Sequence, residues 1–196
     1  MNKSYFEILR PGINTTIQDE GRYNLYHIGV SVSGAIDQRN YKLANSLVGN
    51  NLNEAVIEFA YQGPHLKLKN AKINFAITGD ILFKIIRKNS KIEEGECYRN
   101  YLLEEGDQLD IISTKKSAYG YLSVGGGLEL QKLWKSYSTN TKAKIGSNNG
   151  NKFSSDDKIF ITKSDVKNFL EKKINYKVLI DNTIRVIKGT NFDYFS

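Results

Sequence analysis

One short stretch of the chain gathers several side chains that can bind ligands or move protons. Residues 15–37 read "TTIQDEGRYNLYHIGVSVSGAID" and contain glycines at 21, 29 and 34 together with Gln18, Asp19, Arg22, Ser33 and Asp37. Polar side chains held close together by loops are typical of binding and catalytic sites. An arginine can hold an anion in a bidentate fork, one carboxylate can orient it, and a second can accept an amide N–H or move a proton. The stretch therefore favours a site for a small acidic or amide-bearing ligand, and a salt-bridged loop that only closes the β structure is the alternative.

Other familiar catalytic patterns do not occur in the sequence. The two histidines, His27 and His65, and the single cysteine, Cys97, are too far apart for a zinc site of known spacing, so no metal is expected. Cys97 also has no histidine close in sequence to activate it as a nucleophile. The glycines at 125–127 lack the last glycine of a GxGxxG motif, because Leu130 stands there, and no GxxxxGK(S/T) motif occurs. A known phosphate-binding loop is therefore not predicted.

The composition is that of a folded globular protein with a positive net charge. The chain has 196 residues, of which 40% are hydrophobic and 25% charged, and a net charge of +7. Because the lysines are scattered and no dense arginine run occurs, nucleic-acid binding rests on net charge alone and is not expected. No apolar run reaches the ~20 residues of a membrane span, and the N-terminus lacks the apolar region of a signal peptide. With a lone cysteine, these features predict a cytoplasmic protein without a membrane partner.

The elements that must hold the polar residues are mostly strands. Short alternating segments end at turns that contain glycine or proline, such as Pro11-Gly12, Gly63-Pro64 and Gly79. Their regular spacing predicts one mainly β domain, built as a barrel or a sandwich.

Two short helices are expected among the strands. The first covers residues 38–48, with Asp37 as its N-cap and Gly49 at its C-terminal end. Its inward face consists of Tyr41, Ala44, Leu47 and Val48. The second helix has weaker signals and covers residues 164–173, with Ser164 as its N-cap. Its inward face consists of Val166, Phe169 and Leu170. Residues 146–158, between the two helices, are predicted to form a polar loop.

Several longer motifs resemble one protein family. The segments "LRPGINTTIQDEGR", "GVSVSGAIDQ", "LANSLVGNNLNEAVIEF" and "GPHLKLKNAKINFAITG" follow one another, and "GYLSVGGGLEL", "SYSTNTKAKIG" and "IRVIKGTNFDYF" continue the series. Together they resemble the biotin-dependent carboxyltransferase family. That family includes allophanate hydrolase subunit 2, the C subunit of bacterial 5-oxoprolinase and a sporulation-kinase regulator. The resemblance spans nearly the whole chain.

The resemblance implies a cyclophilin-like β-barrel and a partner, the companion carboxyltransferase-like subunit of the same complex. In one branch of the family the assembled complex uses ATP to open 5-oxoproline to glutamate, and in another a related domain passes a carboxyl group from carboxybiotin to urea. ATP is therefore expected at the level of the complex, and biotin stays open as a cofactor. The matching motifs imply catalytic roles for Asp19, Arg22 and Asp37, and substrate-binding roles for Gln18, Ser33, Gly34, Asn45 and Glu58.

The chain departs from the family pattern at several positions. Ser31 and Ile36 replace the Pro and Met of the family's GVPxSGAMD segment, and Tyr137 replaces the Arg of its S-R-S-T element. The family's C-terminal half is expected to be missing, through a split gene whose second chain supplies it, through decay to a fragment, or because the protein now only binds. The leading hypothesis is a hydrolase subunit of the 5-oxoprolinase or urea and allophanate type that is active only in a complex. The alternative is a non-catalytic binding or regulatory subunit.

Overall fold

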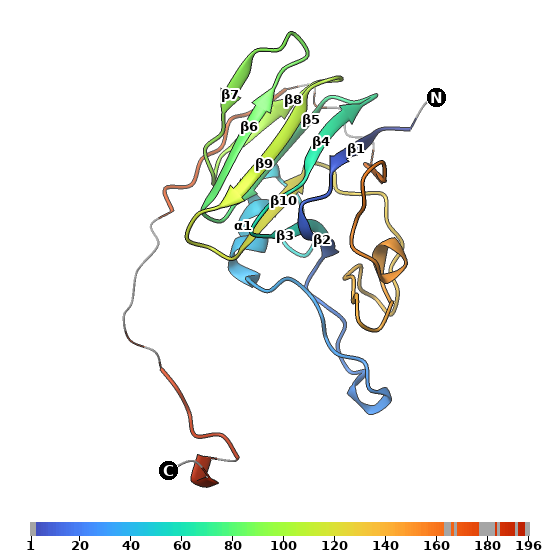
Figure 1. Ribbon diagram of the computed structural model, residues 1–196, viewed down its shortest axis with the longest axis vertical. Helices are drawn as coiled ribbons and strands as arrows, with labels where there is room; N and C mark the ends of the chain where they lie inside the picture. Colours follow the sequence, from blue (N-terminus) through green and yellow to red (C-terminus); the bar gives the residue numbers. More distant parts are fainter. Residues whose placement is uncertain are drawn as a thin grey trace.

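The computed structural model describes residues 3–162, 166, 168–176, 183, 185–190 and 192–194. Most of its regular structure is β (Figure 1). One sheet contains six strands, which are β1 (Tyr5–Arg10), β4 (His65–Lys69), β6 (Ile81–Ile86), β7 (Ile92–Glu94), β9 (Gln108–Thr114) and β11 (Lys158–Phe160). The other contains five, which are β2 (Ile13–Gln18), β3 (Val56–Ala60), β5 (Ile73–Thr78), β8 (Asn100–Leu103) and β10 (Tyr119–Val124). Three 3₁₀ turns complete the set, η1 (Tyr26–Ile28), η2 (Ser147–Gly150) and η3 (Phe192–Tyr194).

The two sheets are antiparallel and share one hydrophobic core. Their strand orders are β11-β1-β4-β9-β6-β7 and β2-β3-β10-β5-β8. Phe6 of β1, Phe75 of β5 and Phe83 of β6 belong to the same buried cluster, which places the core between the sheets. The prediction of a mainly β fold is confirmed. In the part of the chain that the structure describes, the strands form two sheets, and no ladder joins them into one closed barrel.

The last four residues of strand β2 overlap the start of the polar stretch at residues 15–37. Its last four residues are all buried, so the alternation that usually marks a strand is lost. The segment after β10 covers it, because the Thr139 N–H donates to the Ile17 carbonyl (2.9 Å) and the Phe153 N–H to the Thr15 carbonyl (3.0 Å). Phe153 also enters the core, so the predicted polar loop at residues 146–158 is packed against the sheet rather than free of it.

Helix α1 (Gln38–Val48) packs on β5 and β10 and confirms the first helix prediction. Asp37 caps its N-terminus by accepting the N–H groups of Arg39 and Asn40, and Gly49 ends it with φ = 79°. The four expected inward residues, Tyr41, Ala44, Leu47 and Val48, are all buried. No helix among the described residues is long and apolar enough to cross a membrane.

The second helix prediction is wrong where the structure describes it. Its cap, Ser164, lies outside the described residues, and residues 166 and 168–173 are not helical. The Asn100 N–H donates to the Lys172 carbonyl (3.0 Å), and the Lys172 N–H donates back to the Asn100 side chain (2.6 Å). Pairing with the edge of β8 therefore uses the backbone groups that a helix needs, and Leu170 stays 72% exposed.

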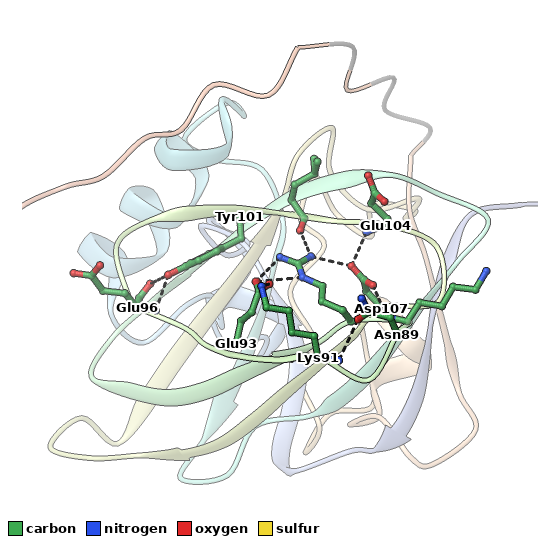
Figure 2. Close-up of polar contacts among 10 residues, drawn as sticks. Asn89, Lys91, Glu93, Glu96, Tyr101, Glu104 and Asp107 are labelled. Atoms are coloured by element: carbon green, nitrogen blue, oxygen red, sulfur yellow. Dashed lines mark hydrogen bonds and ion pairs between the residues drawn. The ribbon is translucent and has the colours of Figure 1, made fainter.

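A charged cluster lies at the β6–β7 hairpin of the six-stranded sheet. Arg87, which follows β6, donates twice to the Glu93 carboxylate (2.8 and 3.2 Å) and once to Asp107 (2.9 Å). Figure 2 shows Glu93 and Asp107 converging on one guanidinium. Asp107 also accepts the N–H groups of Lys88 and Glu104. Because these polar groups satisfy one another, the cluster is structural.

Glu93 is expected to make stability depend on acid pH. The Arg87 hydrogen bonds lower the pKa of the Glu93 carboxyl in the folded chain, so its contribution is present above the unfolded pKa of about 4.3. The contribution is lost as the pH falls through the folded pKa. Denaturant unfolding at a series of pH values should therefore show Glu93→Gln less stable than wild type at neutral pH, by less than ~1 kcal/mol, and equal to it in acid. Glu94→Gln, with no ion pair among described residues, is the control, and an identical profile for both variants would refute the assignment.

Candidate functional site

The predicted site stretch forms a loop that projects from the sheets between β2 and α1 (Figure 1). Two backbone hydrogen bonds close its base, from Arg22 N–H to the Val32 carbonyl (2.8 Å) and from Ala35 N–H to the Asp19 carbonyl (2.9 Å). Gly34 lies at this closure with φ = 91°, and a Cβ there would stand 2.8 Å from the Glu20 carbonyl oxygen. The loop can close only because this position has no side chain.

Asp19 ties the loop to a segment more than a hundred residues away. Its carboxylate is 5% exposed and accepts hydrogen bonds from the Ser136 hydroxyl (2.7 Å), the Ser138 hydroxyl (2.5 Å) and the N–H groups of Tyr137 (2.6 Å) and Gly21 (2.8 Å). Four donors on one buried carboxylate compensate its charge without a cation. Asp19 thereby fixes residues 136–138 beside the loop.

Arg22 is buried in this arrangement but is not ion-paired. It is 1% exposed, and it donates to the Ser138 carbonyl from Nη2 and to the Ser33 hydroxyl from Nη1 (3.3 Å). No described carboxylate lies within 4 Å of its guanidinium, and its Nε has no partner. Two of the five guanidinium N–H groups are thus used within the described residues, so the donor capacity of this buried group is only partly satisfied there. Burial lowers the pKa of Arg22 and the nearby Asp19 charge opposes this shift.

A cavity of about 560 Å³ opens beside Arg22. Its lining brings the projecting loop together with a distant turn, and it consists of Asp19, Glu20, Gly21, Arg22, Tyr23, Asn24, Leu25, Asn53, Lys132, Trp134 and Lys135. Of the two carboxylates, Asp19 is saturated by hydrogen bonds and Glu20 is paired with Lys42 (3.0 Å). The remaining charges, on Arg22, Lys132 and Lys135, are all positive, so the cavity is suited to a small anion.

Three other predicted residues lie close to this cavity or to its supports. The Ser33 hydroxyl accepts from Arg22 and from the Asn140 side chain (3.2 Å), which fixes its position. Gly34 closes the base of the loop, as described above. Gln18 is 6% exposed, and its side chain donates to the Thr139 carbonyl (3.0 Å), while its Oε1 has no partner among the described residues. Asp19, Arg22 and Ser33 therefore come together, with Gln18 bound to the neighbouring segment.

Asp37 lies elsewhere, and the expectation that it shares one pocket with Arg22 is wrong. One carboxylate oxygen caps α1, and the other accepts from the Asn40 side chain (2.7 Å). Asp37 lines a different cavity of about 730 Å³, together with residues such as Asn40, Cys97 and Tyr98. The physical reason is the start of α1, because the capping geometry turns this carboxylate toward the helix N–H groups.

Asn45 and Glu58 occupy internal positions away from the Arg22 cavity. Asn45 is fully buried in α1, donates to the Glu54 carbonyl (2.8 Å) and accepts from the Ser123 hydroxyl (2.6 Å). Glu58 of β3 is 4% exposed and accepts the Ile36 N–H (2.9 Å). Burial raises the pKa of Glu58, although hydrogen bonds from Ile36 and Tyr121 oppose the shift. Both side chains join elements of the fold, and neither lines the cavity at Arg22.

Three further features bear on cofactor or nucleophile chemistry. The described residues contain no group of three or more His, Cys, Asp or Glu that could hold a metal ion. The Cys97 thiol donates to the Ile81 carbonyl (3.3 Å), and burial raises its pKa to about 11, so it is not a thiolate at neutral pH. The N–H groups at 125–127 are bound to the Asn74 carbonyl, the Asn50 side chain and the Val124 carbonyl. This glycine turn therefore offers no free donors to a phosphate.

The residues that complete the cavity were not found from the sequence. Lys132, Trp134 and Lys135 form its far wall, and Ser136 and Ser138 hold Asp19. They lie over a hundred residues from Arg22 in sequence, and no spacing rule connects such distant positions. The only available signal was the "SYST" element at residues 136–139, which the sequence placed in the same family pattern.

The chain is similar to proteins that carry one kind of domain. A family profile described as carboxyltransferase domain, subdomain A and B, matches residues 28–196. The C subunit of the 5-oxoprolinase of Escherichia coli is 27% identical over 191 residues, which are 96% of this chain and 59% of that protein. The urea amidolyase of Saccharomyces cerevisiae is 30% identical over 166 residues, which are 84% of this chain and 9% of that protein. The crystal structure of the K. lactis urea amidolyase matches with a TM-score of 0.75 and 29% identity, over 82% of this chain and 10% of that one. The chain thus spans only part of each relative.

Proposed function

Because the chain belongs to the family of carboxyltransferase domains, subdomains A and B, we propose that it is a subunit of an ATP-dependent amide-processing hydrolase of the 5-oxoprolinase type. The similarity to the C subunit of the E. coli 5-oxoprolinase supports this substrate. The similarity to urea amidolyases makes urea the second candidate, with biotin as the carboxyl carrier in that version. In both versions the working site is completed by a companion subunit.

The buried and unpaired guanidinium of Arg22 is the observation that carries the proposal. A buried cation without a carboxylate partner is costly unless a ligand or ordered water satisfies it. 5-Oxoproline carries a carboxylate beside its ring amide, and a carboxylate fits the planar donor fork of arginine. Urea carries no charge and would bring no anion to Arg22, Lys132 and Lys135. The charge of the cavity therefore favours 5-oxoproline over urea.

The surrounding residues act on substrate binding through Arg22. The Ser138 carbonyl and the Ser33 hydroxyl accept one hydrogen bond each from the guanidinium and so fix its plane. Asp19 holds Ser138 in place and takes all four of its hydrogen bonds from donors within the protein, so we assign it a positioning role rather than that of a free base. Lys132 lies over the Tyr137 ring (5.0 Å to its centre), which keeps its charge at the cavity.

ATP is assigned to the complex and not to a loop of this chain. The glycine turn at 125–127 is the chain's richest glycine segment, and its three N–H groups are already bonded within the protein. These residues do not fit a phosphate group, so no step of the reaction is routed through ATP on this chain. In this proposal the companion subunit supplies nucleotide chemistry, and this chain holds and orients the carboxylate substrate.

Reconstitution tests the proposal. The full chain would be produced with its companion carboxyltransferase-like subunit, and glutamate formation from 5-oxoproline and ATP would be measured beside ATP hydrolysis stimulated by urea and bicarbonate. We expect glutamate formation that requires both chains, and no turnover by this chain alone. Stimulation by urea without any glutamate formation would support the urea-type alternative. Turnover by the isolated chain would contradict the need for a companion.

A binding or regulatory subunit without catalysis is the second candidate. The feature that favours it is Tyr137, which stands where the family resemblance places an arginine and therefore removes a charge next to Asp19. The reconstitution separates the two candidates. A complex that assembles and binds 5-oxoproline without turnover, and that is not restored by Tyr137→Arg, would favour the regulatory role.

A further inference from the structure

We propose that the turn formed by Trp134 and Lys135 is the selectivity wall of the Arg22 cavity, and that it selects a small carboxylate with a flat, uncharged body. Lys135 contacts the anionic group, and the Trp134 indole covers the body of the ligand. This inference rests on the proposed function in one respect, which is that the cavity takes an anionic substrate. Both side chains line that cavity together with Arg22.

The backbone of this turn has a tight and demanding geometry. The Leu133 N–H donates to the Ser136 carbonyl (2.9 Å), and the Ser136 N–H donates back to the Leu133 carbonyl (3.2 Å). The two residues between them are Trp134 (φ = 50°) and Lys135 (φ = 66°). A two-residue connection with positive φ at both positions corresponds to a type I′ turn, for which Asn-Gly or a similar pair is strongly preferred.

The residue types at this turn do not favour the positive φ angles that its backbone adopts. Elsewhere in the described chain, the adjacent pair of non-glycine residues with positive φ is Asn148 and Asn149, a residue type that tolerates this conformation. Tryptophan and lysine side chains do not have this tolerance of positive φ. Strained residues persist where the surroundings fix them, and they cluster at binding sites. Here the fixing contact is the Ser136 hydroxyl, which donates to the buried Asp19 carboxylate (2.7 Å).

Neither side chain at this turn belongs to a hydrophobic core cluster of the described residues. Trp134 is 46% exposed, although it is the chain's single tryptophan and a large apolar side chain. The Lys135 ammonium is in no ion pair with a described residue. An exposed indole and an ammonium without an ion pair among the described residues thus line the same cavity as Arg22, and they define the ligand chemistry. They fit an anion whose flat, uncharged body can lie against an aromatic ring.

Fluorescence reads this site directly, because the emission of the folded chain comes from Trp134 when tryptophan is selectively excited. The chain would be titrated with 5-oxoproline, with 2-pyrrolidinone, which has the same ring without the carboxylate, and with acetate, which has the carboxylate without the ring. We expect a saturable change of emission with 5-oxoproline, at an affinity at least ~10-fold higher than for either fragment. A change equal for 5-oxoproline and acetate would overturn the role of the ring-covering wall.

A double variant separates this role from a purely structural one. Trp134→Asn with Lys135→Gly supplies the preferred turn pair, so the melting temperature should rise. Binding of 5-oxoproline, followed by calorimetry because the fluorophore is gone, should fall at least ~10-fold. The matched control is Ser90→Gly, which removes a positive-φ residue (67°) in the β6–β7 hairpin and should leave binding unchanged. Unchanged binding by the double variant would overturn the proposal and indicate that Trp134 serves another contact.

The outcomes also separate this inference from the proposed function. If the assembled complex binds 5-oxoproline through Trp134 but forms no glutamate, the hydrolase proposal fails and the selectivity wall stands. If glutamate forms at the wild-type rate and KM with the double variant in place, the wall fails and the hydrolase proposal stands.

Discussion

Replacing Arg22 by lysine is expected to weaken 5-oxoproline binding about 100-fold, which corresponds to ~2.7 kcal/mol. The guanidinium is planar, and the Ser138 carbonyl and the Ser33 hydroxyl hold it in place. A lysine ammonium concentrates its donors on one nitrogen. It cannot bond both supports and also hold a carboxylate in a bidentate manner. Turnover of the assembled complex should fall with the loss of binding, and both quantities can be measured on the same preparation.

Arg10→Lys is the matched control for this experiment. Arg10 lies on β1 and donates to the Asp110 carboxylate (2.8 Å) and the Ile111 carbonyl (3.0 Å), outside the Arg22 cavity. Its replacement should leave 5-oxoproline affinity within about 2-fold of wild type, even though it weakens a salt bridge. Equal loss of affinity in both variants would point to a general effect on the fold. Full affinity in a folded Arg22→Lys variant would exclude Arg22 as the anion-binding group.

The parts of the fold that depend on residues close together in the sequence could be predicted from the sequence. Helix α1 has its cap at Asp37, its apolar face and its terminal glycine within a dozen positions, so local rules suffice. The second helix prediction failed because its sequence signals were weak and because the backbone N–H and the side chain of Asn100, at the edge of β8, bind the backbone of Lys172 instead. Such competition depends on which sheet edge is free, and that is a property of the tertiary structure.

For a similar reason, only the part of the candidate site that lies before α1 could be predicted from the sequence. Asp19, Arg22 and Ser33 are close in sequence, and their residue types indicated an anion site. For Asp37 the sequence supports two roles, helix cap and ligand contact, and the structure shows the carboxylate at the cap. The opposite wall arises from long-range packing of the segment after β10, and the strain at Trp134 becomes visible only from backbone angles.

Asp19→Asn is expected to lower the free energy of unfolding by ~3 kcal/mol, with a fall of the melting temperature on the order of 10 °C. The buried carboxylate accepts from two serine hydroxyls and from the N–H groups of Tyr137 and Gly21. A carboxamide keeps one acceptor oxygen and turns an NH₂ group toward donors. At least one of these groups must then stay unsatisfied in a site that is 5% exposed. Because Ser138 also holds Arg22, ligand affinity should fall together with stability.

The neighbouring carboxylate supplies the control that gives this prediction its meaning. Glu20→Gln makes the same chemical change one residue away, where the side chain is about 40% exposed and pairs with a similarly exposed Lys42 at 3.0 Å. An exposed ion pair of this kind contributes less than ~1 kcal/mol. The free energies of unfolding of the two variants, measured with a chemical denaturant, should therefore differ by at least ~2 kcal/mol, since of these two carboxylates it is Asp19 that joins the projecting loop to residues 136–138 inside the protein. If Asp19→Asn costs no more than Glu20→Gln, this carboxylate is not the anchor of the site, and Arg22 is held by Ser33, Ser138 and the loop base without its help.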